Sequence, residues 1–436
     1  GHHNGSRDSI PCVHDAGSVY RPRHPERTSL YRLLEAHLEE YLRCHEERFE
    51  PRDGPLRPHV RRVVEAYLEC GRLHQGFARI RCGNCGEERL LAFSCQTRNV
   101  CPSCQAKRAA LFGIRLAEEV LAAVPHTHVV FTVPKALRGL FQRDRRLLGT
   151  LSQAAYAALR EVVQRELGRR DVVPGFVGVV QTFGSFLNWQ PHLHGLISEG
   201  GFTRDGEFVT LWHLDTDAVE KRFREGVLKR LVGAGRTLRG LADRLRTWSP
   251  SGFDVFAGRQ MTLGETSRIE EMGRYMVRAP LAQDLPQILH DGTVLIPTPP
   301  DPKTGVTELV LDPLEVVHRV VLQIPDPGSH TARYYGAYSC RGRRAQAEPG
   351  RASPPPEGDQ ESQASSDDDA HARQRRRSWA QLLRHIFEVD PLLCGNCGGP
   401  MKVLSVLTDP ATVERILAHL ARSSGPDPPK DDAPRA

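Results

Sequence analysis

Two histidines separated by a single leucine, His192 and His194, are the side chains in this chain best suited to metal chemistry. In a β-strand alternate side chains leave the same face, so both imidazoles would project to one side while Leu193 pointed to the other. Such a pair can bind a divalent metal ion, or it can be two polar residues on the solvent face of a strand. A second pair, His126 and His128, has the same spacing but encloses a threonine. Because the apolar Leu193 can anchor a strand in a core, we expect the metal at His192 and His194.

A tyrosine in the helix predicted over residues 264–280 can supply a nucleophile for the same site. Mg²⁺ and Mn²⁺ prefer oxygen ligands, so two imidazoles need a further donor, and Glu271 is our candidate. Glu271 and Tyr275 are four residues apart and therefore share a helical face. A metal ion there would polarise a phosphodiester while the Tyr275 oxygen displaced a sugar hydroxyl, with Arg274 or Arg278 helping to activate the phenol. The alternative for Tyr275 is a half-buried packing residue.

Two CxxC pairs predict a structural zinc site near the N-terminus. Cys82 and Cys85 are followed, after fifteen intervening residues, by Cys101 and Cys104. This spacing is typical of four thiolates that converge on one tetrahedral ion. Cys95 lies between the pairs and can be a buried thiol or a replacement ligand. Such a site is closed, so it would hold a fold and leave no position for a substrate; coincidentally buried cysteines are the alternative.

The remaining cysteines lack an evident second pair of ligands that would complete a metal site. Cys394 and Cys397 form a further CxxC pair, for which His385 and His419 are possible completing ligands, although both also fit ordinary surface histidines. A histidine lies four residues after Cys70, but a core cysteine is the simpler interpretation of that position. The sequence leaves a second zinc site open.

The charge of the chain favours a polyanionic partner. Its 59 basic and 53 acidic side chains give a net charge of +6, which permits DNA binding without requiring it. The candidates for phosphate contacts are the basic residues beside the CxxC pairs and on the tyrosine helix, namely Arg98, Lys107, Arg108, Arg274 and Arg278. A solvated surface is the alternative for these charges.

The elements that must position these groups follow from hydrophobic periodicity. Helices are predicted near residues 29–49, 58–74, 105–124, 146–168, 216–248, 264–280 and 313–323, and strands near 126–134, 175–187, 188–198, 254–258, 292–300 and 306–312. This mixture favours an α+β fold with a mostly antiparallel sheet flanked by helices. The strand order is not determined by these patterns.

Composition divides the chain into four parts. We expect a helical and zinc-binding module at 20–110, a catalytic domain at 111–340, a disordered linker at 341–378 and a small CxxC module at 379–422. The linker is predicted from its polar, proline-rich sequence. No apolar run of membrane-spanning length and no secretory signal appears, so a cytoplasmic protein is expected.

Four separated motifs carry a family resemblance. They are "CGNC…FSCQTRNVCPSC", "QTFGSFLNWQPHLHGLISEGGF", "GRYMVRAP" and "WAQLLRHIFEVDPLLCGNCGGPM". In this order they resemble the HUH-type transposases of rolling-circle insertion sequences, the IS-ninety-one-like group. The resemblance runs from about Tyr20 to His419 and is interrupted by the predicted linker.

The resemblance implies a DNA strand transferase built on an HUH-endonuclease core. It implies that His192 and His194 hold Mg²⁺ or Mn²⁺ and that Tyr275 forms a 5′-phosphotyrosine link to single-stranded DNA at element ends, freeing a 3′-hydroxyl. Two positions depart from some members: Glu271 stands where they carry a second tyrosine, and Gln190 where they carry a further histidine. The first departure favours a single-tyrosine variant, and the second makes Gln190 an additional ligand candidate.

Two questions remain open at this stage. The stretch "HTARYYGAYS" includes Arg333, Tyr334 and Tyr335, which fit either DNA contacts or aromatic packing at a strand. The function has two rivals, a plasmid replication initiator or relaxase with the same chemistry and a zinc-dependent DNA-binding protein without catalysis.

Overall fold

The structure is a computed structural model that describes residues 25–235, 239–262, 265–282, 285–300, 304–347 and 393–423. The chain divides into two compact units. The described part of the first, which we call the hairpin unit, comprises residues 71–93 and 393–423. The described part of the second, the main unit, comprises 25–70 and 94–347. The helices of the predicted 20–110 module thus group with the catalytic region, and only the stretch 71–93 separates from them.

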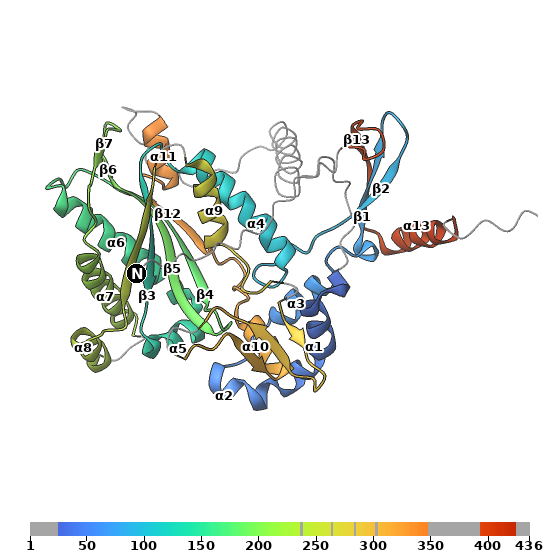
Figure 1. The fold of residues 1–436 in the computed structure, drawn as a ribbon, viewed down its shortest axis with the longest axis horizontal. Helices are drawn as coiled ribbons and strands as arrows, with labels where there is room; N and C mark the ends of the chain where they lie inside the picture. Colours follow the sequence, from blue (N-terminus) through green and yellow to red (C-terminus); the bar gives the residue numbers. More distant parts are fainter. Residues whose placement is uncertain are drawn as a thin grey trace, which may run out of the picture. The chain divides into compact units, whose positions relative to one another are not determined.

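A five-stranded antiparallel sheet forms the centre of the main unit (Figure 1). Its order is β12-β4-β5-β3-β8, and the strands are β3 (His126–Thr132), β4 (Gly175–Phe183), β5 (Trp189–Ser198), β8 (Asp254–Met261) and β12 (Ala332–Gly336). All neighbours in this order pair antiparallel. The predicted α+β class with an antiparallel sheet is therefore confirmed, and the structure adds the order that the sequence left open.

Helices cover both faces of this sheet. On the face that receives Phe131 and Leu193 lie α5 (Lys135–Arg143), α6 (Leu148–Glu166), α7 (Thr216–Gly233) and α8 (Arg239–Thr247). On the face that receives Val179 and Leu196 lie α4 (Pro102–Arg115), the π-helix η3 (Leu116–Val120) and α9 (Thr266–Met276). Strand alternation assigns each side chain to one of these two cores. The histidine-bearing face is the one covered by α4 and α9.

The N-terminal helices form a second layer with the helix near residue 320. This part contains α1 (Ser29–Arg48), α2 (Glu50–Asp53), α3 (Val60–Leu68), α10 (Pro313–Leu322) and the small sheet of β9 (Gln287–Ile288), β10 (Val294–Pro297) and β11 (Glu308–Leu311). They share one apolar core. Asp312 begins α10 by accepting from the Leu314 and Glu315 backbone N–H groups, as an N-cap does.

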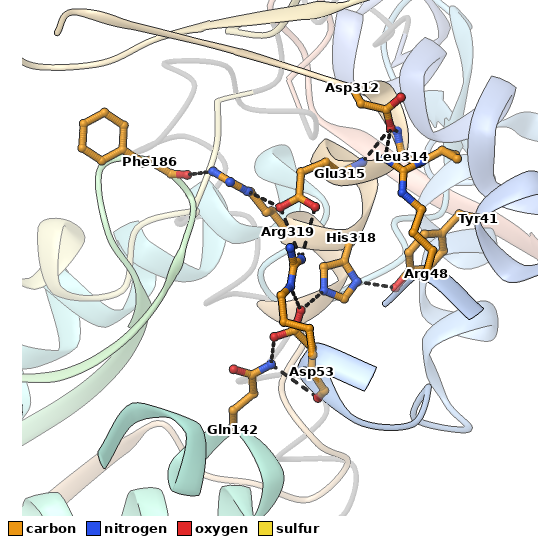
Figure 2. A network of polar contacts seen from close by, with 11 residues as sticks. Tyr41, Arg48, Asp53, Gln142, Phe186, Asp312, Leu314, Glu315, His318 and Arg319 are labelled. Carbon is orange, nitrogen blue, oxygen red and sulfur yellow. Dashed lines mark hydrogen bonds and ion pairs between the residues drawn. The ribbon is translucent and has the colours of Figure 1, made fainter. Parts of the chain in front are cut away.

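A buried polar network fixes α10 to its neighbours (Figure 2). His318 lies 3.0 Å from the Tyr41 hydroxyl through Nδ1 and 2.8 Å from Asp53 through Nε2, and Gln142 donates to Asp53 at 2.8 Å. Burial opposes ionisation of Asp53, yet hydrogen bonds from His318, Arg52 and Gln142 hold its pKa well below its usual range. The network joins α1, α2, α5 and α10, so it stabilises the scaffold on which the sheet rests.

The hairpin unit is built from two distant segments of chain. β1 (Phe77–Cys82) pairs on one side with β2 (Glu88–Ala92) and on the other with β13 (Met401–Leu407), both antiparallel. The unit also contains the short helix η2 (Leu73–Gln75) and α13 (Pro410–Ser423). The sequence predicted no such pairing between the two ends.

The other described elements are short. They are η1 (Pro25–Arg27), η4 (Arg145–Leu147), β6 (Gly200–Phe202), β7 (Phe208–Thr210) and α11 (Cys340–Ala347). The predicted linker lies outside the described residues from 348 onward, and its first residues, 341–347, belong to α11. In the part of the chain that the structure describes, every helix is too short or too polar to traverse a lipid bilayer.

Candidate active site

Two neighbouring strands bring the histidines together. His192 and His194 lie on β5, opposite Thr132 and Val130 of β3, and Leu193 between them is fully buried in the core of the other face. The structure therefore places both imidazoles on one face of the sheet, as the alternation predicts. Their Nε2 atoms are 3.0 Å apart.

The spacing of these nitrogens fits a shared cation. The backbone carbonyl of Gln190 can only accept, so the Nδ1–H of His192 donates to it at 2.8 Å and leaves the lone pair on Nε2. Two ligands at right angles, each about 2.1 Å from an ion, are about 3.0 Å apart. His192 and His194 have this separation. The side chain of Gln190 is not needed for the arrangement, because its backbone supplies the contact.

A third histidine lies next to the pair, although its position in the sequence did not single it out. His128 lies on β3 with its Nε2 3.0 Å from the Nδ1 of His194, and the two rings stack at 5.3 Å. The other member of that pair, His126, instead contacts the Tyr338 hydroxyl at 2.5 Å. The sequence favoured His192 and His194 over this pair, and the structure places His128 in contact with His194. Adjacency of β3 and β5 was the missing information.

Burial keeps these imidazoles neutral. It lowers the pKa of His194 to about 2, with further lowering from His192, His128 and Arg278. It also lowers the pKa of His128 to about 4, and it lowers the pKa of His192 despite the opposing hydrogen bond to Gln190. A neutral imidazole has one nitrogen with a free lone pair, which is the form that binds a metal.

Tyr275 of α9 lies against the histidines. Its ring meets the His194 ring edge-on at 5.3 Å and the His128 ring at 6.3 Å, and 42% of the residue is exposed. The guanidinium carbon of Arg278 lies 4.7 Å from the centre of the Tyr275 ring. The tyrosine is therefore packed on one side against the rings of His194 and His128 and is partly exposed to solvent.

Gln181 of β4 ties α9 to the sheet. Its Nε2 donates to the backbone carbonyls of Tyr275 at 3.1 Å and Met276 at 2.7 Å, which orients the amide because carbonyls only accept. Its Oε1 is buried and has no hydrogen-bond partner among the residues that the structure describes. Gln181 pairs in register with His192 and so shares its face of the sheet. A carbonyl oxygen on the same face of the sheet as the two imidazoles is the type of donor that a hard cation needs.

The close approach of α4 and α9 sets the position of the tyrosine helix. A Cβ added at Gly113 would lie 2.5 Å from the Glu270 carbonyl oxygen, and one at Gly273 would lie 2.7 Å from the Cα of Gly113. Gln105 of α4 also donates to the Val277 carbonyl at 2.6 Å. The two helices therefore touch through backbone, and a larger side chain at this crossing would displace α9.

The structure does not bring Glu271 to the histidines. Its side chain is exposed. Among the described residues, the groups of three or more His, Cys, Asp or Glu ligand atoms within 4.8 Å of one another consist of cysteines alone. Glu271 thus lies apart from the pair, whereas His128 contacts His194 and the buried Gln181 pairs in register with His192.

The basic candidates have different surroundings. Arg98 donates to the backbone carbonyls of Ser329 and Asp326 at 2.5 and 3.0 Å, so its guanidinium supports a loop. Arg274 makes an ion pair with Glu270 at 3.4 Å. Lys107 and Arg108 lie on α4, where Arg108 is exposed, and Arg278 is exposed beside Tyr275. Both terminal nitrogens of Arg98 are thus engaged by backbone carbonyls.

Aromatic packing accounts for the stretch at 330–339. Tyr335 stacks on Tyr156 at 5.0 Å and donates to Ser152 at 3.1 Å. Tyr334 packs in the core beneath α4 and α9, under the Arg343 guanidinium at 5.4 Å. The packing interpretation of these tyrosines is confirmed.

Four cysteines of the main unit form a compact cluster. Cys104 Sγ lies 3.7 Å from that of Cys70 and 3.6 Å from that of Cys95, and Cys101 lies 3.8 Å from Cys70. Tetrahedral thiolates about 2.3 Å from a zinc ion are about 3.8 Å apart. Cys101 caps α4 by accepting from the Cys104 N–H. Hydrogen bonds from the Cys101, Cys70 and Cys95 thiols hold the pKa of Cys104 well below its usual range.

The predicted grouping of the CxxC pairs is therefore wrong. Cys101 and Cys104 meet Cys70 and Cys95, whereas Cys82 and Cys85 belong to the hairpin unit and meet Cys394 and Cys397. Spacing along the chain suggested one quartet, but the first pair belongs to the hairpin unit and the second to the main unit. Cys95 was considered as a replacement ligand, Cys70 was interpreted as a core cysteine, and neither lies in a CxxC motif.

Two family models match the sequence. One, described as "Transposase zinc-binding domain", matches residues 37–133, and the other, described as "Putative transposase", matches residues 175–346. The first range includes Cys70 to Cys104, and the second includes the histidine pair and Tyr275. No solved structure matches the chain. The matches define the class as a transposase with a zinc-binding region.

Two relatives specify the group. The chain is 29% identical over 315 residues to "Putative transposase y4qJ" of Sinorhizobium fredii, which covers 65% of this chain and 75% of the relative. It is 27% identical over 305 residues to "Transposase for insertion sequence element IS801" of Pseudomonas savastanoi pv. phaseolicola, covering 66% and 72%. The resemblance to transposases of the IS-ninety-one-like group is confirmed by these matches, and a transposase implies DNA as the partner.

Proposed function

We propose that this transposase cuts and rejoins single-stranded DNA at element ends through a covalent bond to Tyr275. The observation that carries the proposal is the packing of Tyr275 edge-on against His194 at 5.3 Å, beside two imidazole nitrogens 3.0 Å apart. A partly exposed phenol next to a buried cation site is the arrangement that phosphoryl transfer to tyrosine requires.

The proposed reaction exchanges one ester for another. The Tyr275 oxygen attacks the phosphorus of a phosphodiester, a bond forms between them, and the bond from phosphorus to the 3′ oxygen breaks. The phenol proton passes to water at the exposed side of the ring, and the departing oxygen takes up one proton to become a 3′-hydroxyl. A 5′-phosphotyrosine link results, and its attack by another 3′-hydroxyl reverses the step without ATP.

The residues that would hold a catalytic cation are His192, His194 and Gln181. When bound, Mg²⁺ or Mn²⁺ would polarise the phosphate and stabilise its developing negative charge. Gln181 Oε1 would supply the hard oxygen donor that the imidazoles lack, which agrees with this buried atom having no hydrogen-bond partner in the described part of the chain. The same amide holds the end of α9, so metal binding and tyrosine placement share one residue.

Two contacts would set the histidine tautomers. The Gln190 carbonyl fixes the Nδ1–H of His192, and His128 can accept from the Nδ1–H of His194. Each contact leaves the Nε2 lone pair on the shared side of the pair. His128 would thus act as a positioning residue. Arg278 would stabilise the negative charge of the Tyr275 oxygen and, with Arg108 and Arg274, contact DNA phosphates.

The cluster of Cys70, Cys95, Cys101 and Cys104 would hold a structural zinc ion. Its place at the first turn of α4 suits this role, because α4 packs directly on α9 at Gly113. The zinc would fix the start of α4, and α4 in turn would fix the tyrosine helix. This zinc ion would then influence Tyr275 through the packing of α4 on α9 and not by coordination.

A strand-polarity experiment tests the reaction. Purified protein is incubated with Mn²⁺ and single-stranded DNA from an element end, labelled at either its 3′ or its 5′ terminus. The proposal expects the 3′ label on the protein after denaturing electrophoresis, and the 5′ label on a shorter free strand ending in a 3′-hydroxyl. The opposite polarity, or no adduct with any element end while zinc content is complete, would refute it.

A further inference from the structure

The same five residues, Cys-Gly-Asn-Cys-Gly, occur twice in the chain, at 82–86 and 394–398. The two copies fold alike. Gly86 and Gly398 both have left-handed backbone, with φ of 77° and 68°. Each glycine N–H donates to the carbonyl of the first cysteine of its own copy, at 3.2 and 2.8 Å. Each first cysteine N–H also donates to the residue after that glycine, at 2.8 Å in both copies.

The two copies face each other within the hairpin unit. Cys82 Sγ lies 3.5 Å from Cys397 Sγ, and Cys85 Sγ lies 3.5 Å from Cys394 Sγ. All four sulfur atoms lie within 4.8 Å of one another. A disulfide requires about 2.05 Å between sulfurs, so these are free thiols. Separations slightly below about 3.8 Å fit a tetrahedron of thiolates around one ion.

We propose that Cys82, Cys85, Cys394 and Cys397 form the two halves of one zinc site. Four sulfur donors in two tight turns favour a tetrahedral ion, and four protein ligands leave no position for a substrate. The ion would join the N-terminal hairpin to a strand contributed from beyond residue 392. It is separate from the zinc site of the main unit and does not depend on tyrosine chemistry.

The small core of the hairpin unit explains why a metal is needed. The apolar cluster that surrounds the site contains Ile80, Cys82, Cys394 and Met401, with Leu91 packed against it. Val403 and Val406 of β13 are more than half exposed. A unit of this size buries too little apolar surface to be stable alone, and a structural metal commonly supplies the difference. The zinc would hold β13 in register on β1.

Metal analysis of the full-length protein tests the proposal. We expect two zinc ions per chain in the wild type and one in Cys394→Ser with Cys397→Ser. The exposed Cys340 gives a matched control, since Cys340→Ser should retain both ions. One zinc in the wild type, two in the double variant, or iron in place of zinc at this site would overturn the proposal.

A second measurement avoids variants that fail to fold. The wild-type protein is reconstituted with cadmium-113 and its NMR spectrum is recorded. Two resonances in the tetrathiolate range are expected, one for each cluster. A single tetrathiolate resonance at full cadmium loading would contradict the second site.

Discussion

The two proposed metal sites of the main unit, the cysteine cluster and the histidine pair, differ in how many coordination positions they leave free for a substrate. In the cysteine cluster, Cys70, Cys101 and Cys104 are buried and four sulfurs can occupy every position of a tetrahedral ion. At the histidine pair, two imidazoles leave positions free beside a tyrosine that is 42% exposed. Closed sites maintain structure and open ones admit a substrate. We therefore expect the cysteine cluster to control folding and the histidine pair to control the chemistry at Tyr275.

The largest effect on adduct formation is expected from a substitution of Tyr275, the proposed nucleophile beside the histidine pair. Tyr275→Phe removes only the hydroxyl, so the covalent adduct should fall to background while zinc content stays unchanged. Tyr335→Phe is the matched control, because that hydroxyl donates to Ser152 within the core. Electrophoresis of labelled DNA with each variant gives the measurement. An adduct of wild-type yield in Tyr275→Phe would show that Tyr275 is not the nucleophile, and the histidine pair would then not differ from the cysteine cluster by serving the chemistry.

Removal of an open-site ligand should have the next largest effect. Cation assistance supplies several kcal/mol of transition-state stabilisation, and each 1.36 kcal/mol corresponds to a tenfold change in rate. His194→Ala should therefore slow adduct formation by roughly a thousandfold. Its zinc content, measured in parallel, should equal that of the wild type. A rate close to wild type would place the catalytic cation elsewhere.

The closed sites can be separated from each other by activity. Loss of Cys101 and Cys104 to serine should release one zinc, destabilise α4 and lower adduct formation by about a hundredfold, since a misplacement of 1 Å can have this effect. Loss of Cys394 and Cys397 should release the other zinc and leave cleavage of a short single strand within about threefold of wild type. Equal losses of activity in both variants would show that the hairpin unit also supports the catalytic centre. Metal content and initial cleavage rates provide the test.

Gln181 tests whether the histidine pair belongs to a site for a hard cation, because such a site needs an oxygen donor and a thiolate site does not. Gln181→Leu should weaken the apparent affinity for Mn²⁺ by about 10–100-fold, the range seen for groups that support metal ligands. Gln181→Glu retains an oxygen donor and should therefore bind Mn²⁺ more tightly than Gln181→Leu does. Titration of Mn²⁺ against cleavage rate measures both. Identical Mn²⁺ affinities in wild type and Gln181→Leu would exclude the oxygen as a ligand.

The smallest effect is expected at Gly113, where α4 packs on α9 and so connects the cysteine cluster to the tyrosine helix. Gly113→Ala puts a methyl group against the Glu270 carbonyl and should lower the free energy of unfolding by about 1–3 kcal/mol. Gly139→Ala in α5 has open space and should be neutral or stabilising by up to about 1 kcal/mol. Chemical denaturation compares the two. If both variants gain stability, α4 and α9 do not meet as closely as described.

Local patterns predicted the elements well and their neighbours poorly. Alternation around Leu193 placed His192 and His194 on one face, and helical spacing placed Tyr275 on α9. His128 was missed because its role depends on β3 lying next to β5, a pairing between segments more than sixty residues apart. Sequence spacing cannot supply such a pairing.

The cysteines show the same limit. Two CxxC pairs within one stretch of chain suggested one site, yet each pair finds partners elsewhere, at Cys70 and Cys95 or beyond residue 392. The repeated Cys-Gly-Asn-Cys-Gly was visible in the sequence and is the signal that could have matched its two copies. Cys70 and Cys95 carried no such signal, because they are single cysteines placed by the end of α3 and a loop.

Identification of the residue bonded to DNA tests the central claim most directly. Wild-type protein is allowed to form an adduct with single-stranded DNA in Mn²⁺, the DNA is trimmed by nuclease, and the peptides are sequenced by mass spectrometry. The account predicts one nucleotide-bearing peptide, modified at Tyr275, with its phosphate on the tyrosine oxygen. Modification at Tyr334, Tyr335 or any other residue, with Tyr275 unmodified, would contradict it.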